Sequence, residues 1–206
     1  MPQETQEDHH VWGENLADPA HADQVVELAR RARGDAAPPS PRPTVVTLDG
    51  PAGSGKSSLA RLVADRLDAP VVHLDDLLPG WDGLPAAPAL LTTQVLVPLA
   101  RGEQAAFRRF DWHAGEFAEL VPVPAADFLV VEGVASSVGV ARAYADVRVW
   151  LEAAHDVRMQ RGLARDGDGF AGHWEAWAAQ EARIFEADGT AAHAHLRLQT
   201  DGPALP

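Results

Sequence analysis

A glycine-rich segment carries the strongest chemical signal in the sequence. Residues Gly50–Ser57 read GPAGSGKS, which fits the complete pattern G-x-x-x-x-G-K-[ST]. In this pattern, backbone N–H groups surround phosphate oxygens, the lysine reaches the β- and γ-phosphates, and the final hydroxyl binds Mg²⁺. The chain has sixteen arginines but one lysine, which stands in this motif, where a planar guanidinium cannot replace a compact ammonium. We therefore expect ATP or GTP, with Mg²⁺, to be bound by Gly50, Ala52, Gly53, Ser54, Gly55, Lys56, Ser57 and Ser58.

Carboxylates follow two apolar segments that have the composition of strands. Asp75 and Asp76 come directly after residues 70–74, where a strand of a doubly wound sheet meets the ligand crevice. A carboxylate there can accept the proton of an attacking hydroxyl or hold a metal-bound water. Alternatively, the pair only caps a helix or turn. Because side chains alternate along a strand, we expect one of the two to face the site. Glu132 closes a third strand in the same way and is expected to hold Mg²⁺ with Ser57, the alternative being a glutamate exposed to water.

Three arginines are spaced as on one face of a helix. Arg158, Arg161 and Arg165 recur at intervals of three and four, and residues 166–172 then include three glycines. Such a row beside a glycine-rich loop suits a lid, residues 158–172, that closes over the triphosphate and neutralises charge during transfer. We expect Arg158 to contact the nucleotide and Arg161 and Arg165 to act in catalysis. The alternative is a solvated basic stripe.

Residues 108–112 (RRFDW) combine charge, aromatic faces and a carboxylate, as a pocket for a ring and its hydroxyls would. An ordinary amphipathic hairpin is the alternative. The histidines show no spacing that pairs with further zinc ligands, and Trp174 and Trp177 are expected to pack in the core. Substrate contacts are expected from Asp76, Arg109, Phe110, Asp111 and Trp112.

These residues need a scaffold that gathers strand ends. Apolar segments predict strands at 44–49, 70–74, 127–132 and 147–151, with a last short one at 196–198. Helices are expected at 56–67, 92–101, 155–165 and 173–187, with Pro98 shortening or kinking the second. Residues 79–88 are expected to be loop, and 105–124 an excursion with short strands. The alternation predicts an α/β fold with a doubly wound parallel sheet covered on both faces.

The sequence before this domain reads as an extension, residues 1–43, so that the main domain spans 44–206. Residues 1–20 are polar, acidic and aperiodic, and we expect them to be poorly ordered. Residues 22–33 fit one helical face, and the proline-rich connector 34–43 follows. We expect this helix to be docked on the main domain or tethered to it.

Charge and composition exclude several classes of partner. A formal net charge of −13 disfavours nucleic acid and anionic lipid surfaces, and the absence of cysteine excludes disulfides and thiolate sites. No apolar run approaches the ~18 residues that a bilayer span requires, and the acidic start lacks a signal-peptide core. We expect a cytoplasmic protein with a small-molecule partner. The sequence leaves open whether the protein forms a homo-oligomer.

With these motifs assembled, residues from about Thr44 to Phe185 resemble the uridine–cytidine kinases, particularly bacterial uridine-kinase-like proteins. Gly50–Ser57 matches the family's GxxxSGKS loop, and Asp75-Asp76-Leu77-Leu78 matches the step that carries its catalytic aspartate. Phe110-Asp111-Trp112 is similar to its Y-D-F segment, and Glu132-Gly133-Val134 to its E-G-[IL] step. The family's lid pattern is matched by Arg158, Arg161, Arg165 and Asp166. The resemblance implies a P-loop fold of the nucleoside/nucleotide kinase type. It also implies that Asp75 is the catalytic base; as a carboxylate at a strand end, Asp75 is in addition expected among the metal ligands.

The chain departs from the family at three places. Leu77 and Leu78 replace paired aromatics, Gly115 stands where the family has a pocket histidine, and Gly162 replaces an arginine of the lid pattern. A pocket that loses hydrogen-bond partners for a base loses discrimination for it. The kinase chemistry therefore carries over better than uridine or cytidine as the substrate.

The sequence thus predicts Mg²⁺-dependent transfer of the ATP or GTP γ-phosphate to a hydroxyl of a small molecule, with a nucleoside as the first choice. One alternative is a kinase of another metabolite, such as a sugar, a vitamin precursor or an antibiotic. An alternative of another class is a regulatory NTPase that binds nucleotide and hydrolyses it slowly.

Overall fold

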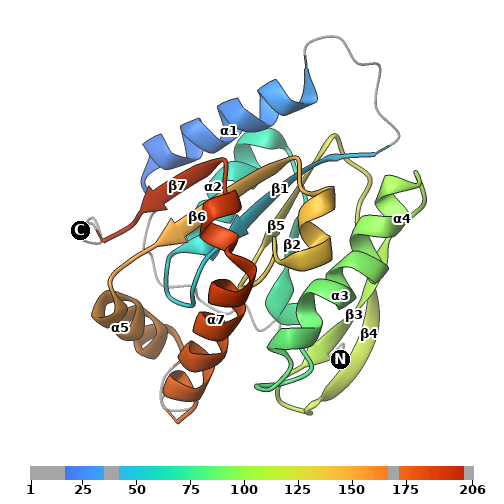
Figure 1. The fold of residues 1–206 in the computed structure, drawn as a ribbon. Helices are drawn as coiled ribbons and strands as arrows, with labels where there is room; N and C mark the ends of the chain where they lie inside the picture. The colour runs from blue at the N-terminus through green and yellow to red at the C-terminus, as the bar shows by residue number, and fades with distance from the viewer. Residues whose placement is uncertain (1–16, 35–41, 167–171, 202–206) are drawn as a thin grey trace, which may run out of the picture.

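Five short apolar segments form the central sheet of the computed structural model, which describes residues 17–34, 42–166 and 172–201. All neighbouring strands run parallel (Figure 1), and every residue of the central strand is buried. Near-continuous apolar strands are typical of a parallel sheet that helices cover on both faces. In sheet order the strands are β2 (Val71–His73), β5 (Phe128–Glu132), β1 (Thr44–Asp49), β6 (Val147–Glu152) and β7 (Leu196–Gln199). All five predicted strands are present, and the predicted doubly wound parallel sheet is confirmed.

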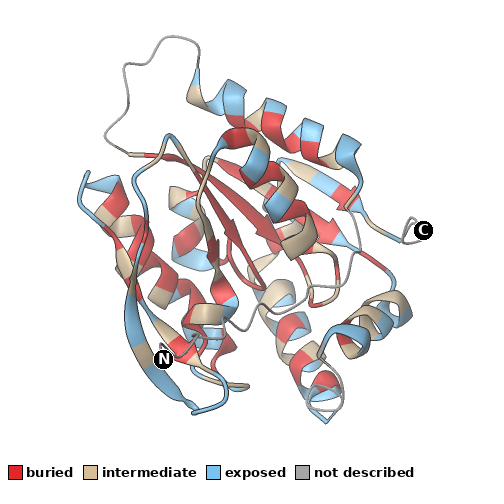
Figure 2. Cartoon of the chain, turned by 180° about the vertical axis from the view of Figure 1, so that it is seen from behind, coloured by how far each residue is buried: buried red, intermediate tan, exposed pale blue. Residues whose placement is uncertain are grey.

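Side chains that alternate along the strands fill two apolar clusters, one on each face of the sheet. Figure 2 shows in red that the strands of the sheet are mostly buried. On β5, Leu129 and Val131 enter one cluster and Val130 enters the other. One face is covered by α1 (Pro19–Arg33) and α2 (Lys56–Leu67). The other is covered by α3 (Ala87–Leu91), the π-helical turn η3 (Thr92–Leu96), α4 (Val97–Ala100) and α7 (Trp174–Asp188).

Helix α1 packs against α2 and the sheet through its buried side chains Ala22, Val25, Val26 and Ala29. It begins three residues before the predicted start because Asp18 caps it, accepting a hydrogen bond from the N–H of Ala20 at 2.8 Å, and Pro19 occupies the first helical position. The poorly ordered start predicted for residues 1–20 lies mostly outside the described residues. So do most of the predicted connector and the glycines at 167 and 169.

The predicted excursion forms an antiparallel hairpin of β3 (Ala106–Asp111) and β4 (Glu116–Pro122), separate from the main sheet. The remaining elements are η4 (Gly139–Tyr144), α5 (His155–Asp166) and η5 (Thr190–His193). In the part of the chain that the structure describes, every helix is too short or too polar to cross a membrane.

Two local predictions are wrong, and a third is wrong in part. Strand β2 stops at His73, and a 3₁₀ turn, η1 (Leu74–Leu77), carries the two aspartates. Residues 84–88 are helical, because Pro85 and Pro88 stand near the start of η2 (Leu84–Ala86) and of α3, where proline needs no N–H partner. Proline 98 does not shorten its helix, which continues to Ala100, but the π turn η3 directly before α4 is a departure from α-helical geometry next to Pro98, where a kink was the other expectation.

Candidate active site

The glycine-rich loop lies between β1 and α2, and two of its glycines are required by close neighbours. A Cβ on Gly50 would lie 2.1 Å from the Leu151 carbonyl oxygen, and one on Gly53 would lie 2.3 Å from that of Arg158. Both glycines also have positive φ, at 143° and 78°. Lys56 is buried at the start of α2, where its Nζ donates a hydrogen bond to the Pro51 carbonyl at 2.9 Å. The segment therefore forms a tight loop between strand and helix, as the glycine pattern predicts, with the lysine bonded back to the loop.

Asp49, the last residue of β1, supports this loop and was not singled out from the sequence. Its carboxylate is 1% exposed and accepts hydrogen bonds from the backbone N–H groups of Gly50 and Ala135 and from the N–H and hydroxyl of Ser137, all at 2.8–2.9 Å. Burial raises the pKa of Asp49, while these hydrogen bonds and the charge of Lys56 oppose the rise. Asp49 thus ties the segment after β5 to the start of the glycine-rich loop.

Ser57, Glu132 and His73 meet at the ends of α2, β5 and β2. The Ser57 hydroxyl donates to Glu132 Oε1 at 3.0 Å, and His73 Nδ1 lies 2.7 Å from the same oxygen. Glu132 is 4% exposed, so the alternative of a glutamate exposed to water does not hold. Burial alone would raise the pKa of Glu132, but the hydrogen bond and charge of His73, with Lys56 and Ser57, lower it; the bond to Glu132 raises the pKa of His73. His73 was missed because nothing in the sequence pairs a strand-end histidine with a glutamate far along the chain.

The two aspartates of η1 have different neighbours. Asp75 is exposed; desolvation by the neighbouring protein and the charge of Glu132 nevertheless raise its pKa, while the charges of Arg165 and Lys56 oppose the rise. Desolvation also raises the pKa of Asp76, whose opposing charges are His73 and Arg109. Because the pair lies on a 3₁₀ turn, strand alternation does not separate them. Their charged neighbours do: Asp75 is on the side of the glycine-rich loop, and Asp76 is on the side of the hairpin.

A magnesium ion would find oxygen donors here, as its chemistry requires. Ser57 supplies a hydroxyl, and Glu132 and Asp75 supply carboxylates, the set expected from the sequence. Within the described residues, no cluster of three or more His, Cys, Asp or Glu side chains could hold a metal alone. This donor set fits an ion that keeps waters and shares substrate phosphates rather than one held in an all-protein cage.

The arginine row on α5 packs against the glycine-rich loop. Arg158 Nη1 donates to the Ala52 carbonyl at 3.1 Å, and Arg161 Nη1 donates to that of Gly53 at 3.4 Å. Arg161 Nη2 also donates to the Thr200 carbonyl at 2.6 Å, beyond the end of β7, and its desolvation lowers its pKa. Arg165 is exposed and close enough to Asp75 to act on its charge. Arg158 and Arg161 therefore support the loop, and a solvated stripe does not describe them.

The hairpin residues divide between two roles. Arg109 pairs with Glu119 at 2.6 Å, and Asp111 accepts hydrogen bonds from turn N–H groups of His113 and Ala114 at 2.9 Å, as in an ordinary hairpin. Trp112, by contrast, contacts η1, the turn that carries Asp75 and Asp76: its Nε1 donates to the Asp75 carbonyl at 3.1 Å. Buried Phe110 packs edge-on against Trp112, with ring centroids 5.5 Å apart. Aromatic faces thus lie beside Asp75.

Glu181 of α7 is a second residue that sequence reasoning missed. It is 2% exposed, and its Oε2 accepts hydrogen bonds from the Ala52 N–H and from Trp177 Nε1. Trp174 and Trp177 are buried in the core, as predicted. The only local signal for Glu181 was its position one helical turn after Trp177.

Neither a protein-family profile nor a curated protein matches the sequence. Solved structures do match. A possible uridine kinase from Bacillus stearothermophilus has a TM-score of 0.60 and 20% identity, over 87% of this chain and 99% of that one. A "putative fructose transport system kinase" from Silicibacter sp. TM1040 gives 0.51 and 22%, over 87% and 98%. Shikimate kinase from Acinetobacter baumannii, in complex with shikimate, gives 0.50 and 13%, over 79% and 86%.

This chain has the P-loop NTPase fold. In that fold the crevice lies at the carboxyl ends of the strands, where the chain order reverses beside the first strand. Here β1 lies between β5 and β6, and the P-loop, Glu132 and η1 all follow strand ends at that edge of the sheet. The structure thus brings Lys56, Ser57, Glu132 and Asp75 to the same end of the sheet, and it places Asp111 at the end of β3, where its carboxylate binds the hairpin turn.

Proposed function

We propose that the protein is a small-molecule kinase that transfers the γ-phosphate of ATP or GTP to a hydroxyl. The observation that carries the proposal is the surroundings of Asp75 on η1, because the charges of Lys56 of the P-loop and of Arg165 act on its carboxylate. A nucleotide-binding switch needs no acceptor base there. The three structural relatives described above are all named as kinases, and this supports the same class of chemistry.

Each residue then has a role in an in-line transfer. The P-loop amides and Lys56 bind the β- and γ-phosphates, and Arg165 offsets charge on the transferred group. The acceptor oxygen bonds to the γ-phosphorus, the bond from that phosphorus to the β–γ bridging oxygen breaks, and ADP or GDP leaves. Asp75 takes the acceptor proton. Its raised pKa favours this step, since a base is most effective when its pKa approaches the working pH.

Magnesium, held by Ser57 and Glu132 with Asp75 near it, would supply charge neutralisation and orient the phosphates. His73 keeps the Glu132 carboxylate in place through its hydrogen bond. Arg158 and Arg161 keep the carbonyl side of the P-loop fixed, so its N–H groups remain directed to the phosphates.

For the acceptor we propose a nucleoside first. The aromatic faces of Trp112 and Phe110 beside Asp75 suit a planar ring, and Asp76 and Arg109 are polar groups at the same end. A second acceptor class, a sugar or other polyol, is supported by the loss of the aromatic pair: Leu77 and Leu78 are fully buried core residues and offer no ring face.

The test is ADP or GDP release with Mg²⁺ and a panel of nucleosides, hexoses and shikimate, with the phosphorylated product identified by mass spectrometry. Release that depends on one acceptor class, and is lost in Lys56→Ala and Asp75→Asn, supports the proposal. Slow hydrolysis that no acceptor accelerates would instead assign the protein to the regulatory NTPases. Absence of nucleotide binding would remove both.

A further inference from the structure

One turn of α7, residues 177–181, contacts both halves of the candidate site. On the nucleotide side, buried Glu181 accepts the hydrogen bond from the Ala52 N–H of the P-loop. On the acceptor side, Gln180 Nε2 donates to the Trp81 carbonyl at 3.1 Å. Trp177 connects the two, because its Nε1 donates to Glu181 at 3.2 Å and its ring meets that of Trp81 edge-on at 6.0 Å.

The contacts continue from Trp81 to the proposed base. Trp81 belongs to the acceptor loop, residues 79–83 between η1 and η2, and it stacks on His173 at 4.3 Å with the planes 8° apart. On its other side it meets Trp112 at 5.1 Å, and Trp112 donates to the Asp75 carbonyl. Described contacts therefore run without interruption from the P-loop, through α7, to η1.

Charge gives this connection a way to respond to nucleotide. Glu181 is buried beside the P-loop with Arg158, whose Nη1 lies 3.7 Å from Glu181 Oε1 and also donates to the Ala52 carbonyl. Burial raises the pKa of Glu181, and Lys56 and Arg158 oppose the rise. Phosphates that enter the loop bring negative charge close to this carboxylate and engage the same cations. Bound nucleotide therefore changes the relative energies of side-chain positions of Glu181 nearer to and farther from the P-loop. Such a difference is what a ligand needs to shift an equilibrium.

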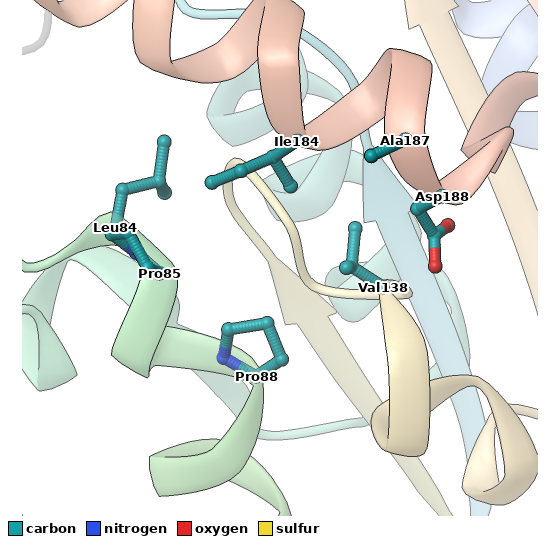
Figure 3. A pocket seen from close by; sticks show the side chains of 7 residues that line it. All are labelled: Leu84, Pro85, Pro88, Val138, Ile184, Ala187 and Asp188. Carbon is teal, nitrogen blue, oxygen red and sulfur yellow. The ribbon is translucent and has the colours of Figure 1, made fainter.

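Helix α7 is packed unevenly along its length. Its C-terminal half faces η2 and α3 across an open groove of about 340 Å³, shown in Figure 3. The groove is lined by Leu84, Pro85, Pro88, Val138, Ile184, Ala187 and Asp188. Its N-terminal half is packed in the core through Trp174 and Trp177, so the response carried by residues 177–181 is a small change in side-chain contacts rather than a shift of the whole helix.

We propose that α7 couples nucleotide occupancy of the P-loop to the position of the acceptor loop, with Glu181 as the positioning residue. The inference rests on nucleotide binding, which is part of the proposed function. In consequence, nucleotide binding alone changes the position of the acceptor loop, without a bound acceptor.

The test uses the full chain and Mg²⁺ with a non-hydrolysable ATP analogue. Calorimetry gives the dissociation constant, and hydrogen exchange of residues 78–84 gives the loop response. In the wild type, the analogue should change exchange in this segment several-fold. Gln180→Ala should leave the dissociation constant within about twofold and reduce the loop response to less than a third, because it cuts only the acceptor-side bond.

Glu181→Gln separates coupling from simple support. It keeps an acceptor for the Ala52 N–H but removes the buried negative charge, so analogue binding should become about three- to tenfold tighter while the loop response falls. A purely structural role would predict weaker binding. Trp177→Phe keeps a ring but loses the donor to Glu181, so it should also reduce the loop response. It replaces Glu181→Gln as the test if that variant folds poorly. Glu186→Gln, the same change at an exposed position of α7, is the control and should alter neither readout.

The outcomes separate the two proposals. If the wild type binds the analogue but residues 78–84 do not respond, the coupling is wrong and the kinase proposal stands. A response that persists in both Gln180→Ala and Glu181→Gln also overturns the coupling. Failure of the wild type to bind the analogue would remove both.

Discussion

Replacing Asp49 tests how the P-loop is held to the sheet. The Asp49 carboxylate is 1% exposed and accepts hydrogen bonds from Gly50, Ala135 and Ser137, the last through both its N–H and its hydroxyl. Asp49→Ala removes the acceptor of four donors at once. The Ser137 hydroxyl can turn to another acceptor, but three backbone N–H groups cannot.

The cost follows from those three groups. A buried donor left without a partner costs about 1–3 kcal/mol, so three give about 3–9 kcal/mol before relaxation. The carboxylate also bears its own burial cost, which is why its pKa is raised, and its removal returns part of the loss. We expect a net loss of about 3–5 kcal/mol, as when one partner of a buried ion pair is removed. Asp49→Asn keeps one oxygen for Gly50 and Ala135 but turns an NH₂ toward Ser137, and should cost about 1–2 kcal/mol.

Urea and thermal unfolding of both variants measure these losses. For a chain of this length about 1 kcal/mol lowers the Tm by about 2–4 °C, so Asp49→Ala should melt about 6–20 °C below the wild type. Asp65→Ala, at an exposed position on α2, is the control and should stay within about 0.5 kcal/mol. An Asp49→Ala variant within about 1 kcal/mol of the wild type would refute the assignment of Asp49 as the anchor.

The other predictions concern the site itself. Lys56→Ala should lose nearly all phosphate transfer but only about 1 kcal/mol of stability, the value of its bond to Pro51, as unfolding curves and saturating Mg-ATP assays will show. Asp75→Asn should lower kcat by about 10²–10⁴ with nucleotide affinity kept, whereas Asp76→Asn should cost less; equal effects would contradict their different surroundings. Because the pKa of Asp75 is raised, the wild-type rate should decrease as the pH is lowered, with an apparent pKa above the ~3.9 of a free aspartate. His73→Gln tests the raised pKa of His73. The stability that protonated His73 contributes is complete below its unfolded pKa of ~6.5 and is lost as pH rises through its folded pKa. The variant should therefore lose more unfolding free energy at pH 5.5 than at pH 9. Gly53→Ala should abolish analogue binding measured by calorimetry, because the new Cβ would lie 2.3 Å from the Arg158 carbonyl oxygen.

Patterns confined to a few neighbouring residues made the fold predictable. The β-branched run of β1, the glycine motif and the periodicity of α2 are local signals, and all were placed correctly. Capping and turn chemistry were less well read. Proline 85 and Pro88 start helical turns rather than loops, and the chain turns at Leu74, one residue earlier than its apolar run indicates.

The supporting residues could not be predicted, because their partners are distant in sequence. Glu181 contacts Ala52 across 129 positions, and Asp49 contacts Ser137 across 88. Apart from its position one helical turn after Trp177, nothing near Glu181 in the sequence distinguishes it from an exposed helical glutamate. The arginine row illustrates the same limit: the spacing predicted one face of a helix, but only the fold shows that the P-loop covers part of that face.

The position of Lys56 has a practical consequence for labelling chemistry. Apart from the α-amino group, the chain carries a single primary amine, and the fold buries it with its Nζ bonded to the Pro51 carbonyl. Acylating reagents that modify dozens of sites in an ordinary protein therefore have one side-chain target here. The rate at which that amine is acylated measures how often the loop opens, residue-specifically and in the unmutated chain. A bound phosphate would be read as protection of the same atom.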